Sequence, residues 1–224
     1  MKMDLEQRLF ENFGFHTFKP GQKAVIEHLL KKQDTLAVLP TGTGKSLCYQ
    51  FVGQMIEGTV LIVSPLLSLM EDQVTQLQKK GETRVIALNS SLSFLEKQYV
   101  LAHLSEYKFV LISPETLTQK EVRHKIASLK IALFVIDEAH CVSQWGVDFR
   151  PEYTKLAGIQ EECGYPLTLA LTATATPAVK KEILQQVFTQ RKEISEVIFS
   201  VDRPNIGLIA VSYTHLTLPT NREV

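Results

Sequence analysis

Short apolar runs alternate with longer amphipathic segments along most of the chain. The apolar runs are about five residues long, rich in β-branched and aliphatic side chains, with little polar alternation. They lie at residues 35–39, 59–63, 84–88, 109–112, 132–136 and 167–171. Such runs are typical of strands that are buried on both faces. The pattern therefore predicts a sheet that is covered by helices on both sides.

Helical periodicity appears in the segments between these runs. Apolar residues recur at helical spacing in residues 22–32, 66–80 and 177–188. The last segment starts with Pro177, which a helix accepts in its first turn because that position needs no N–H donor. Alternating strands and helices imply right-handed crossovers and a mostly parallel sheet. The predicted fold class is α/β, with three αβα layers.

The first predicted strand leads into a candidate phosphate loop. The segment reads Pro40-Thr41-Gly42-Thr43-Gly44-Lys45-Ser46 and continues into an apolar helix. Gly42 and Gly44 permit a tight backbone whose N–H groups point at phosphate oxygens, and the helix adds its positive N-terminal end. We expect Lys45 to reach the β and γ phosphates of ATP and Ser46 to bind Mg²⁺. Leu39 stands where the strict pattern has glycine, so the alternative is a glycine-containing turn with an unrelated Lys-Ser pair.

Two acids follow the predicted strand at residues 132–136, in the segment Asp137-Glu138-Ala139-His140. A strand that delivers acids at its carboxyl end places them in the crevice where open α/β sheets bind ligands. We expect Asp137 to hold Mg²⁺ and Glu138 to deprotonate the attacking water. Lys45, Asp137 and Glu138 are therefore the predicted catalytic residues. Alone, such an acidic pair is often only a solvated strand end, and the phosphate loop favours the catalytic interpretation.

Aromatic and cationic residues come directly after the acids. Trp145, the only tryptophan of the chain, is followed by Phe149 and Arg150. Aromatic faces and guanidinium planes stack on unpaired bases at roughly 1–3 kcal/mol per base. We predict a nucleic-acid contact here, beside the site of the γ phosphate. The alternative is that Trp145 and Phe149 only pack the loop onto the domain.

Composition excludes several other classes of protein. Lys and Arg number 24, as do Asp and Glu, so there is no global basic surface and any nucleic-acid site must be local. Three cysteines at wide spacing form neither a disulfide framework nor a zinc pattern. No apolar run reaches the roughly 18 residues that span a bilayer. These features predict a cytoplasmic protein without membrane contact.

Together, the phosphate loop, residues 137–140 and the aromatic stretch 141–153 resemble superfamily 2 helicases, and the aromatic stretch is similar to that of the RecQ group. Val147 stands where the RecQ pattern usually has histidine. The resemblance implies a P-loop NTPase with the RecA-like fold of helicase domain 1. It further implies an ATP-dependent DNA helicase that moves 3′ to 5′, with ATP and Mg²⁺ as cofactors and single-stranded and duplex DNA as partners.

Further segments carry the same resemblance. Residues 13–22 are similar to the motif that reads adenine, which implies base contacts from Phe15, Lys19 and Gln22. Residues 64–74 begin with Ser64-Pro65 and are similar to the family's first DNA-contacting motif. Residues 169–176 are similar to the motif that links hydrolysis to strand movement. That similarity implies coupling roles for Thr172 and Thr174, with His140 as their partner.

The resemblance also predicts a domain organisation. Residues 1–34 form the adenine-reading segment and lead helix, and residues 35–210 form the RecA-like domain. Residues 202–205 resemble the end of the family's first motor domain. Residues 211–224 depart from the family pattern and are expected to be a non-native or truncated tail, the alternative being a divergent strand. The second motor domain is expected to be missing from the chain, so the isolated chain should hydrolyse ATP very slowly. An RNA helicase, a nucleic-acid-binding module that does not unwind, and a P-loop ATPase acting on other substrates remain open alternatives.

Overall fold

The computed structural model describes residues 4–145, 148–191 and 193–199 of the chain. Val147, residues 202–205 and the tail 211–224, on which the sequence carries predictions, lie outside the described residues. Within the described part, no helix is long and apolar enough to cross a membrane.

A seven-stranded sheet forms the centre of the molecule, and every strand pair in it is parallel. Its strand order is β3-β4-β2-β5-β6-β1-β7. The strands are β1 Thr35–Val38, β2 Thr59–Val63, β3 Val85–Leu88, β4 Phe109–Ile112, β5 Ile131–Ile136, β6 Thr168–Thr172 and β7 Ser195–Ile198. The first six confirm the predicted strands to within one residue at each end, and β7 was not predicted.

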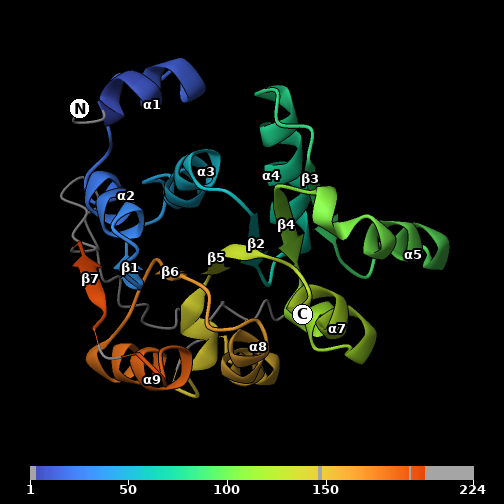
Figure 1. Ribbon diagram of the computed structural model, residues 1–224. Coiled ribbons are helices and arrows are strands. Elements are labelled where there is room, and N and C mark those ends of the chain that lie inside the picture. The colour runs from blue at the N-terminus through green and yellow to red at the C-terminus, as the bar shows by residue number, and fades with distance from the viewer. Residues whose placement is uncertain (1–3, 146–147, 192, 200–224) are drawn as a thin grey trace, which may run out of the picture.

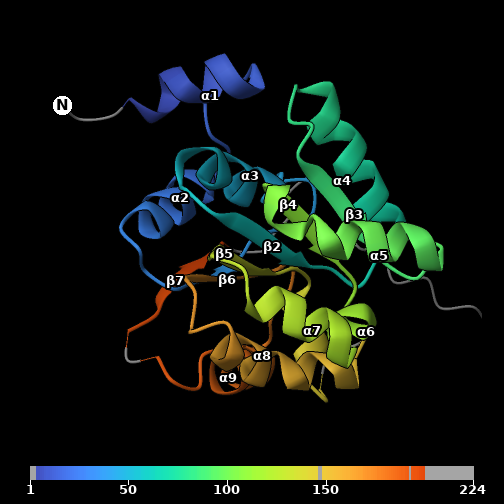
Figure 2. The same ribbon diagram turned by 45° about the vertical axis from the view of Figure 1, so that its right-hand side comes forward.

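Helices cover both faces of this sheet (Figures 1 and 2). One face carries α1 to α4, and the other carries α7 to α9. The helices are α1 Leu5–Phe13, α2 Gln22–Leu30, α3 Lys45–Met55, α4 Leu67–Lys79, α5 Phe94–Ala102, α6 Pro114–Leu117, α7 Lys120–Ala127, α8 Leu156–Glu162 and α9 Pro177–Val187. Short 3-10 turns lie at Leu104–Glu106, Ala139–Val142 and Pro151–Lys155. The predicted three-layer αβα fold is confirmed.

Alternation along each strand divides the core into two apolar clusters. In β2, Leu61 and Val63 pack toward α7, α8 and α9, whereas Val60 and Ile62 pack toward α2 and α3. Because successive side chains of a strand point to opposite faces, a strand between two helical layers must be apolar at every position. This requirement explains the continuous apolar runs in the sequence. It also fixes which face each residue just beyond a strand will take.

A partly buried ion pair closes the sheet at the amino end of β1. Arg191 Nη1 lies 3.2 Å from Asp34 Oδ2, and the two side chains are 16% and 12% exposed. Asp34 also accepts a 2.8 Å bond from the Thr168 N–H, while Arg191 donates to the carbonyl of Pro166 at 2.7 Å. The pair thereby links β1, β6 and the segment that leads into β7.

We expect Asp34→Ala to lower the free energy of unfolding by about 2–3 kcal/mol, because it leaves a largely buried guanidinium and an amide without their acceptor. Thermal denaturation should show a drop in Tm of roughly 4–10 °C. The matched control is Glu162→Ala, which breaks the exposed pair with Arg123 and should change stability by less than about 1 kcal/mol. Equal losses in the two variants would contradict the assignment of a structural role to the Asp34 pair.

Candidate nucleotide site and nucleic-acid interface

The phosphate loop has the backbone that the sequence predicts. Gly42 and Gly44 both take left-handed conformations, with φ of 80° and 72°, and α3 begins directly at Lys45. Among the described residues, no side chain caps the amino end of α3. Its first N–H groups are therefore available to an anion, and the helix dipole favours negative charge there. This arrangement fits the phosphates of a nucleotide.

Gln22 braces the loop from the start of α2. Its side chain is 2% exposed, and its Oε1 accepts a 2.8 Å bond from the Lys19 N–H. Its Nε2 donates to the carbonyls of Thr43 and Gly44 at 2.7 and 3.0 Å. Lys19 adds a 2.9 Å bond from its ammonium to the Gly42 carbonyl. The structure thus brings the predicted adenine motif against the phosphate loop.

The base contacts themselves stay predictions. The ring of Phe15 is exposed beside this segment, as a stacking platform must be. The amide of Gln22 has its partners inside the chain, so a base would have to take over some of these bonds. Phe199, which follows β7, packs on the backbone of Gly21, where a Cβ would come within 3.0 Å of the Phe199 ring. Sequence analysis missed Phe199 because β7 carries no strand pattern.

Asp137 sits at the carboxyl end of β5 and is 5% exposed. Its N–H donates to the carbonyl of Val63 at 2.9 Å, and its carbonyl accepts a 2.9 Å bond from the buried Tyr153 hydroxyl. Burial and the neighbouring charge of Glu138 raise the pKa of Asp137 to about 6, and the charge of Lys45 opposes the rise. Sequence analysis missed Tyr153, since a contact between residues 16 positions apart in a loop leaves no periodic signal.

Glu138 has a left-handed backbone, with φ of 49° and ψ of 47°. A non-glycine residue in this region pays a conformational cost, and such residues cluster at functional sites. His140 Nδ1 lies 3.3 Å from Glu138 Oε2. This contact with His140, with help from the charge of Lys45, lowers the pKa of Glu138. The carboxylate is therefore ionised at neutral pH and able to accept a proton.

His140 joins the acids to the end of β6. Its Nδ1 lies 3.0 Å from Thr172 Oγ1, and the Thr172 hydroxyl donates to the Thr174 carbonyl at 2.9 Å. Because that hydroxyl proton is committed to Thr174, the oxygen accepts from the histidine. Contacts with the Cys141 sulfur and the Glu138 carboxylate raise the pKa of His140 to about 10, so the ring carries its proton. The structure brings together the three residues that the sequence predicts as a coupling set.

The aromatic loop presents its tryptophan to solvent. Trp145 is 77% exposed, and Phe149 is 37% exposed. Arg150 Nη1 lies 3.4 Å from Glu115 Oε1, and its Nε is buried without a hydrogen-bond partner among the described residues. A ring that is three-quarters exposed does not hold a loop onto a domain, so the packing alternative fails for Trp145. The nucleic-acid role of these residues remains a prediction.

Ser64 and Pro65 lie at the end of β2, and both are buried. The Ser64 side chain is 0% exposed, so it offers no surface to a nucleic acid in this structure. Leu66, the next residue, is 45% exposed. The predicted contact of Ser64 and Pro65 with DNA stays a prediction that the local burial does not favour.

The donor groups at this edge fit a magnesium ion that arrives with a nucleotide. Across the described residues, no three His, Cys, Asp or Glu side chains gather to hold a metal by themselves. Mg²⁺ keeps several waters and commonly uses one or two protein oxygens together with substrate phosphates. Ser46 in the first turn of α3 and Asp137 at the end of β5 would supply those protein oxygens.

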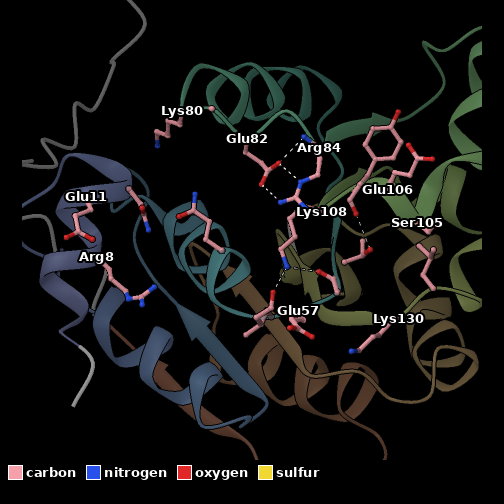
Figure 3. Close-up of a pocket in the computed structure, with 18 residues that line it drawn as sticks. Arg8, Glu11, Glu57, Lys80, Glu82, Arg84, Ser105, Glu106, Lys108 and Lys130 are labelled. Carbon is pink, nitrogen blue, oxygen red and sulfur yellow. Dashed lines mark hydrogen bonds and ion pairs between the residues drawn. The ribbon is translucent and has the colours of Figure 1, made fainter. Parts of the chain in front are cut away.

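A cavity of about 850 Å³ opens at the opposite edge of the sheet (Figure 3). Cationic and anionic side chains alternate around it, and Arg84 pairs with Glu82 inside it at 3.1 Å. Lys108 donates to the carbonyls of Ile56 and Gly58 at 2.5 and 2.6 Å, and burial lowers its pKa. Acids match most of the cations that line this cavity, and Lys108 is bound to backbone carbonyls, so the cavity does not resemble a phosphate site.

Comparison with known proteins identifies the family of the chain. Residues 19–183 match the family described as DEAD/DEAH box helicase. The chain is 54% identical over 206 residues to the "Probable ATP-dependent DNA helicase RecS" of Bacillus subtilis, covering 91% of this chain and 41% of that protein. It is 44% identical over 196 residues to the "ATP-dependent DNA helicase RecQ" of Pasteurella multocida, covering 87% of this chain and 30% of that protein. The chain thus spans less than half the length of these relatives, and the predicted resemblance to RecQ helicases is confirmed.

Solved structures agree in fold. The structure of Mss116p bound to single-stranded RNA and AMP-PNP superposes with a TM-score of 0.70 at 20% identity, over 87% of this chain and 42% of that one. A hypothetical ATP-dependent RNA helicase from Sulfolobus tokodaii gives a TM-score of 0.65 at 19% identity, over 88% of this chain and 57% of that one. At this identity the likeness concerns the fold alone, and it confirms the predicted RecA-like fold.

Proposed function

The chain belongs to the DEAD/DEAH box helicase family, and from this premise we propose that it is the nucleotide-binding first motor domain of a RecQ-type, ATP-dependent DNA helicase. The observation that carries the proposal is a continuous set of contacts at the carboxyl edge of the sheet. It runs from Glu138 through His140 to Thr172 and Thr174. A site that only stored nucleotide would not need this connection.

In the proposed mechanism, the amino end of α3 and Lys45 bind the phosphates, and Ser46 and Asp137 would hold Mg²⁺. A magnesium ion held there would supply neutralisation of the charge that develops on the phosphates. Glu138 orients the attacking water and takes its proton, because His140 and Lys45 keep its carboxylate ionised. Water activation and charge neutralisation are separate tasks, so the two acids differ in burial and in pKa.

In the same proposal, His140 transmits a change of charge on the Glu138 carboxylate to the end of β6. The protonated ring sits between the Glu138 carboxylate and the Thr172 hydroxyl, so a change of charge at Glu138 alters the bond to Thr172. The Thr172 hydroxyl donates to the Thr174 carbonyl. A displacement of Thr172 is therefore proposed to displace the backbone at Thr174 as well. This is the physical basis of the proposed coupling between hydrolysis and movement along a strand.

The parts of the proposal that concern the whole protein are based on the RecS and RecQ relatives. The remaining length of the RecS and RecQ proteins is proposed to correspond to a second motor domain that completes the site with an arginine finger. Such a finger is worth about 10³–10⁵ in rate in related motors, so this chain alone should hydrolyse ATP slowly. Movement 3′ to 5′, a monomeric state and a cytoplasmic location on cellular DNA belong to the same proposal. Residues 1–34 and 35–210 are proposed as its adenine-reading segment and motor core.

The test is steady-state ATP hydrolysis by the protein that carries this chain, measured without nucleic acid, with single-stranded DNA, and with RNA of the same sequence. Stimulation by DNA above that by RNA is expected. Stronger stimulation by RNA would replace the DNA helicase with an RNA helicase. Hydrolysis that ignores both nucleic acids would leave the phosphate site in place and refute the helicase.

Trp145→Ala should reduce the affinity for single-stranded DNA by about fivefold to a hundredfold, since stacking is worth roughly 1–3 kcal/mol per base. Hydrolysis in the absence of DNA should be unchanged, because the ring is exposed to solvent. Fluorescence anisotropy with a labelled oligonucleotide measures the effect. Phe94→Ala, at an aromatic ring that is 74% exposed on α5, is the control and should bind DNA normally. Matching losses in both variants would argue against a specific platform.

A further inference from the structure

Ser64 has a buried hydroxyl that the fold does not use. The side chain is 0% exposed, and its Oγ lacks a hydrogen-bond partner among the described residues. A buried hydroxyl without a partner costs about 1–3 kcal/mol in a folded protein. An alanine would avoid that cost. The position therefore carries an unsatisfied donor at the edge of the sheet where the nucleotide site lies.

Strand register makes Ser64 the cross-strand neighbour of Asp137. Val63 pairs with Ile136, and the ladder continues one residue further because the Asp137 N–H donates to the Val63 carbonyl at 2.9 Å. Ser64 and Asp137 are therefore neighbours on adjacent strands, about 5 Å apart across the sheet. No other strand intervenes between β2 and β5.

Both residues also take the same face of the sheet. Ile62 and Val135, two positions before Ser64 and Asp137, pack in the cluster with α2 and α3. Since side chains alternate between faces, Ser64 and Asp137 continue toward that cluster. The face is the one on which α3 begins at Lys45. The unpartnered hydroxyl, the buried carboxylate and the phosphate-binding helix thus share one corner of the fold.

We propose that Ser64 is a positioning residue for the metal-binding carboxylate. When a magnesium nucleotide binds, the Ser64 hydroxyl donates a hydrogen bond to Asp137 and fixes the carboxylate in the orientation that faces the metal. The Glu138 N–H already bonds to Asp137 Oδ1 at 3.0 Å. A carboxylate has lone pairs for about four hydrogen bonds, so one further donor can be accepted alongside the metal. Outer partners of this kind hold the ligands of metal sites in productive orientations.

The inference rests on the proposed function, because it takes Asp137 as a ligand of the nucleotide-bound metal. It differs from that function in assigning Ser64 to the metal site instead of to contact with DNA. Measuring nucleotide binding without any nucleic acid present distinguishes a role of Ser64 at the metal site from a role in contact with DNA. Binding of AMP-PNP is titrated at fixed protein concentration, once with Mg²⁺ and once with EDTA, and Mn²⁺ binding is followed by electron paramagnetic resonance.

For Ser64→Ala we expect a Tm that is equal to or above that of the wild type, because an unpaired buried hydroxyl has been removed. Affinity for AMP-PNP in Mg²⁺ should fall by about tenfold or more, the usual value of a hydrogen bond to a charged group. Affinity in EDTA should not change, and Mn²⁺ binding should weaken in parallel. A purely structural serine would show the opposite pattern, a lower Tm with normal affinity.

Ser113→Ala is the matched control. Ser113 lies at the same edge one strand further along, and its hydroxyl is satisfied by Thr116 in the cap of α6. We expect this variant to lose stability and to keep its magnesium-dependent affinity. Normal magnesium-dependent affinity in Ser64→Ala would overturn the inference alone. A wild-type protein whose nucleotide affinity ignores Mg²⁺ would overturn both the inference and the proposed metal site.

Discussion

Glu138→Gln lowers the rate of ATP hydrolysis by about 10²–10⁴-fold, the range for removal of a general base, and leaves the binding of ATP nearly intact. Glutamine preserves the shape of the side chain but cannot accept a proton at neutral pH. The left-handed backbone at this position is unchanged, because both residues have the same Cβ and the same steric demands. The loss should therefore appear in kcat, with KM close to that of the wild type.

Single-turnover hydrolysis measured with saturating DNA, together with equilibrium binding of ATP, separates these two effects. Glu106→Gln, at the opposite edge of the sheet in the mixed-charge cavity, is the control for removal of one negative charge and should hydrolyse ATP normally. A kcat within about tenfold of the wild type would mean that another group takes the proton.

Lys45→Met has the second large effect and acts on affinity. The ammonium group is expected to contact two phosphates, and hydrogen bonds to charged groups are worth about 1.5–3 kcal/mol each. Removing them should weaken ATP binding by about 10²–10⁴-fold. The charge of Lys45 also lowers the pKa of Asp137 and of Glu138. Its loss therefore affects the acids as well as the phosphates.

Because Lys45 also acts on the acids, Lys45→Met should change the pH dependence of nucleotide affinity. Magnesium competes with a proton for Asp137, whose pKa burial raises to about 6. Magnesium-dependent nucleotide affinity is thus present above that pH and is lost as the pH falls through it. In Lys45→Met the midpoint should move to higher pH, because the opposing charge is gone. Isothermal titration between pH 5 and 8 measures the shift, with Lys130→Met at the far edge of the sheet as the control. An unchanged midpoint would show that Lys45 lies too far from the acids to influence them.

The sequence was informative wherever local pattern and tertiary environment demanded the same residues. Strands β1 to β6 are enclosed between two helical layers, so burial forces them to be apolar at every position. Strand β7 lies at the edge of the sheet, and only Val197 of its four residues is buried. Its pattern therefore carries no strand signal. Helices α7 and α8 were not predicted, because segments of so few turns leave little room for periodicity to appear. Helix α5 is as long as α2, but it exposes Phe94, Leu95 and Tyr99, so its large apolar residues do not mark one buried face.

In the candidate site, too, the features set by local sequence could be predicted, and those set by the packing of distant segments could not. Gly42, Gly44 and Lys45 act through neighbours in sequence, and their loop formed as the motif predicts. Asp137, Glu138 and His140 follow one strand, so the strand pattern alone was enough to infer their position at the carboxyl edge. Contacts between distant segments could not be inferred in this way. The bracing of the phosphate loop by Gln22, the bond from Tyr153 to Asp137 and the burial of Ser64 all depend on how separate elements pack.

The left-handed backbone of Glu138 limits how stable this domain can become. A non-glycine residue in that conformation costs on the order of 1–3 kcal/mol, and the neighbouring Asp137 pays to remain charged while buried. Both costs are borne by residues that the proposed chemistry cannot replace. Substitutions in helix caps, loops and surface charges can therefore raise the thermal stability of this domain. Selection for activity keeps the residues at the end of β5 less stable than other residues there could be. The most rigid form of this fold and its most active form are two different sequences.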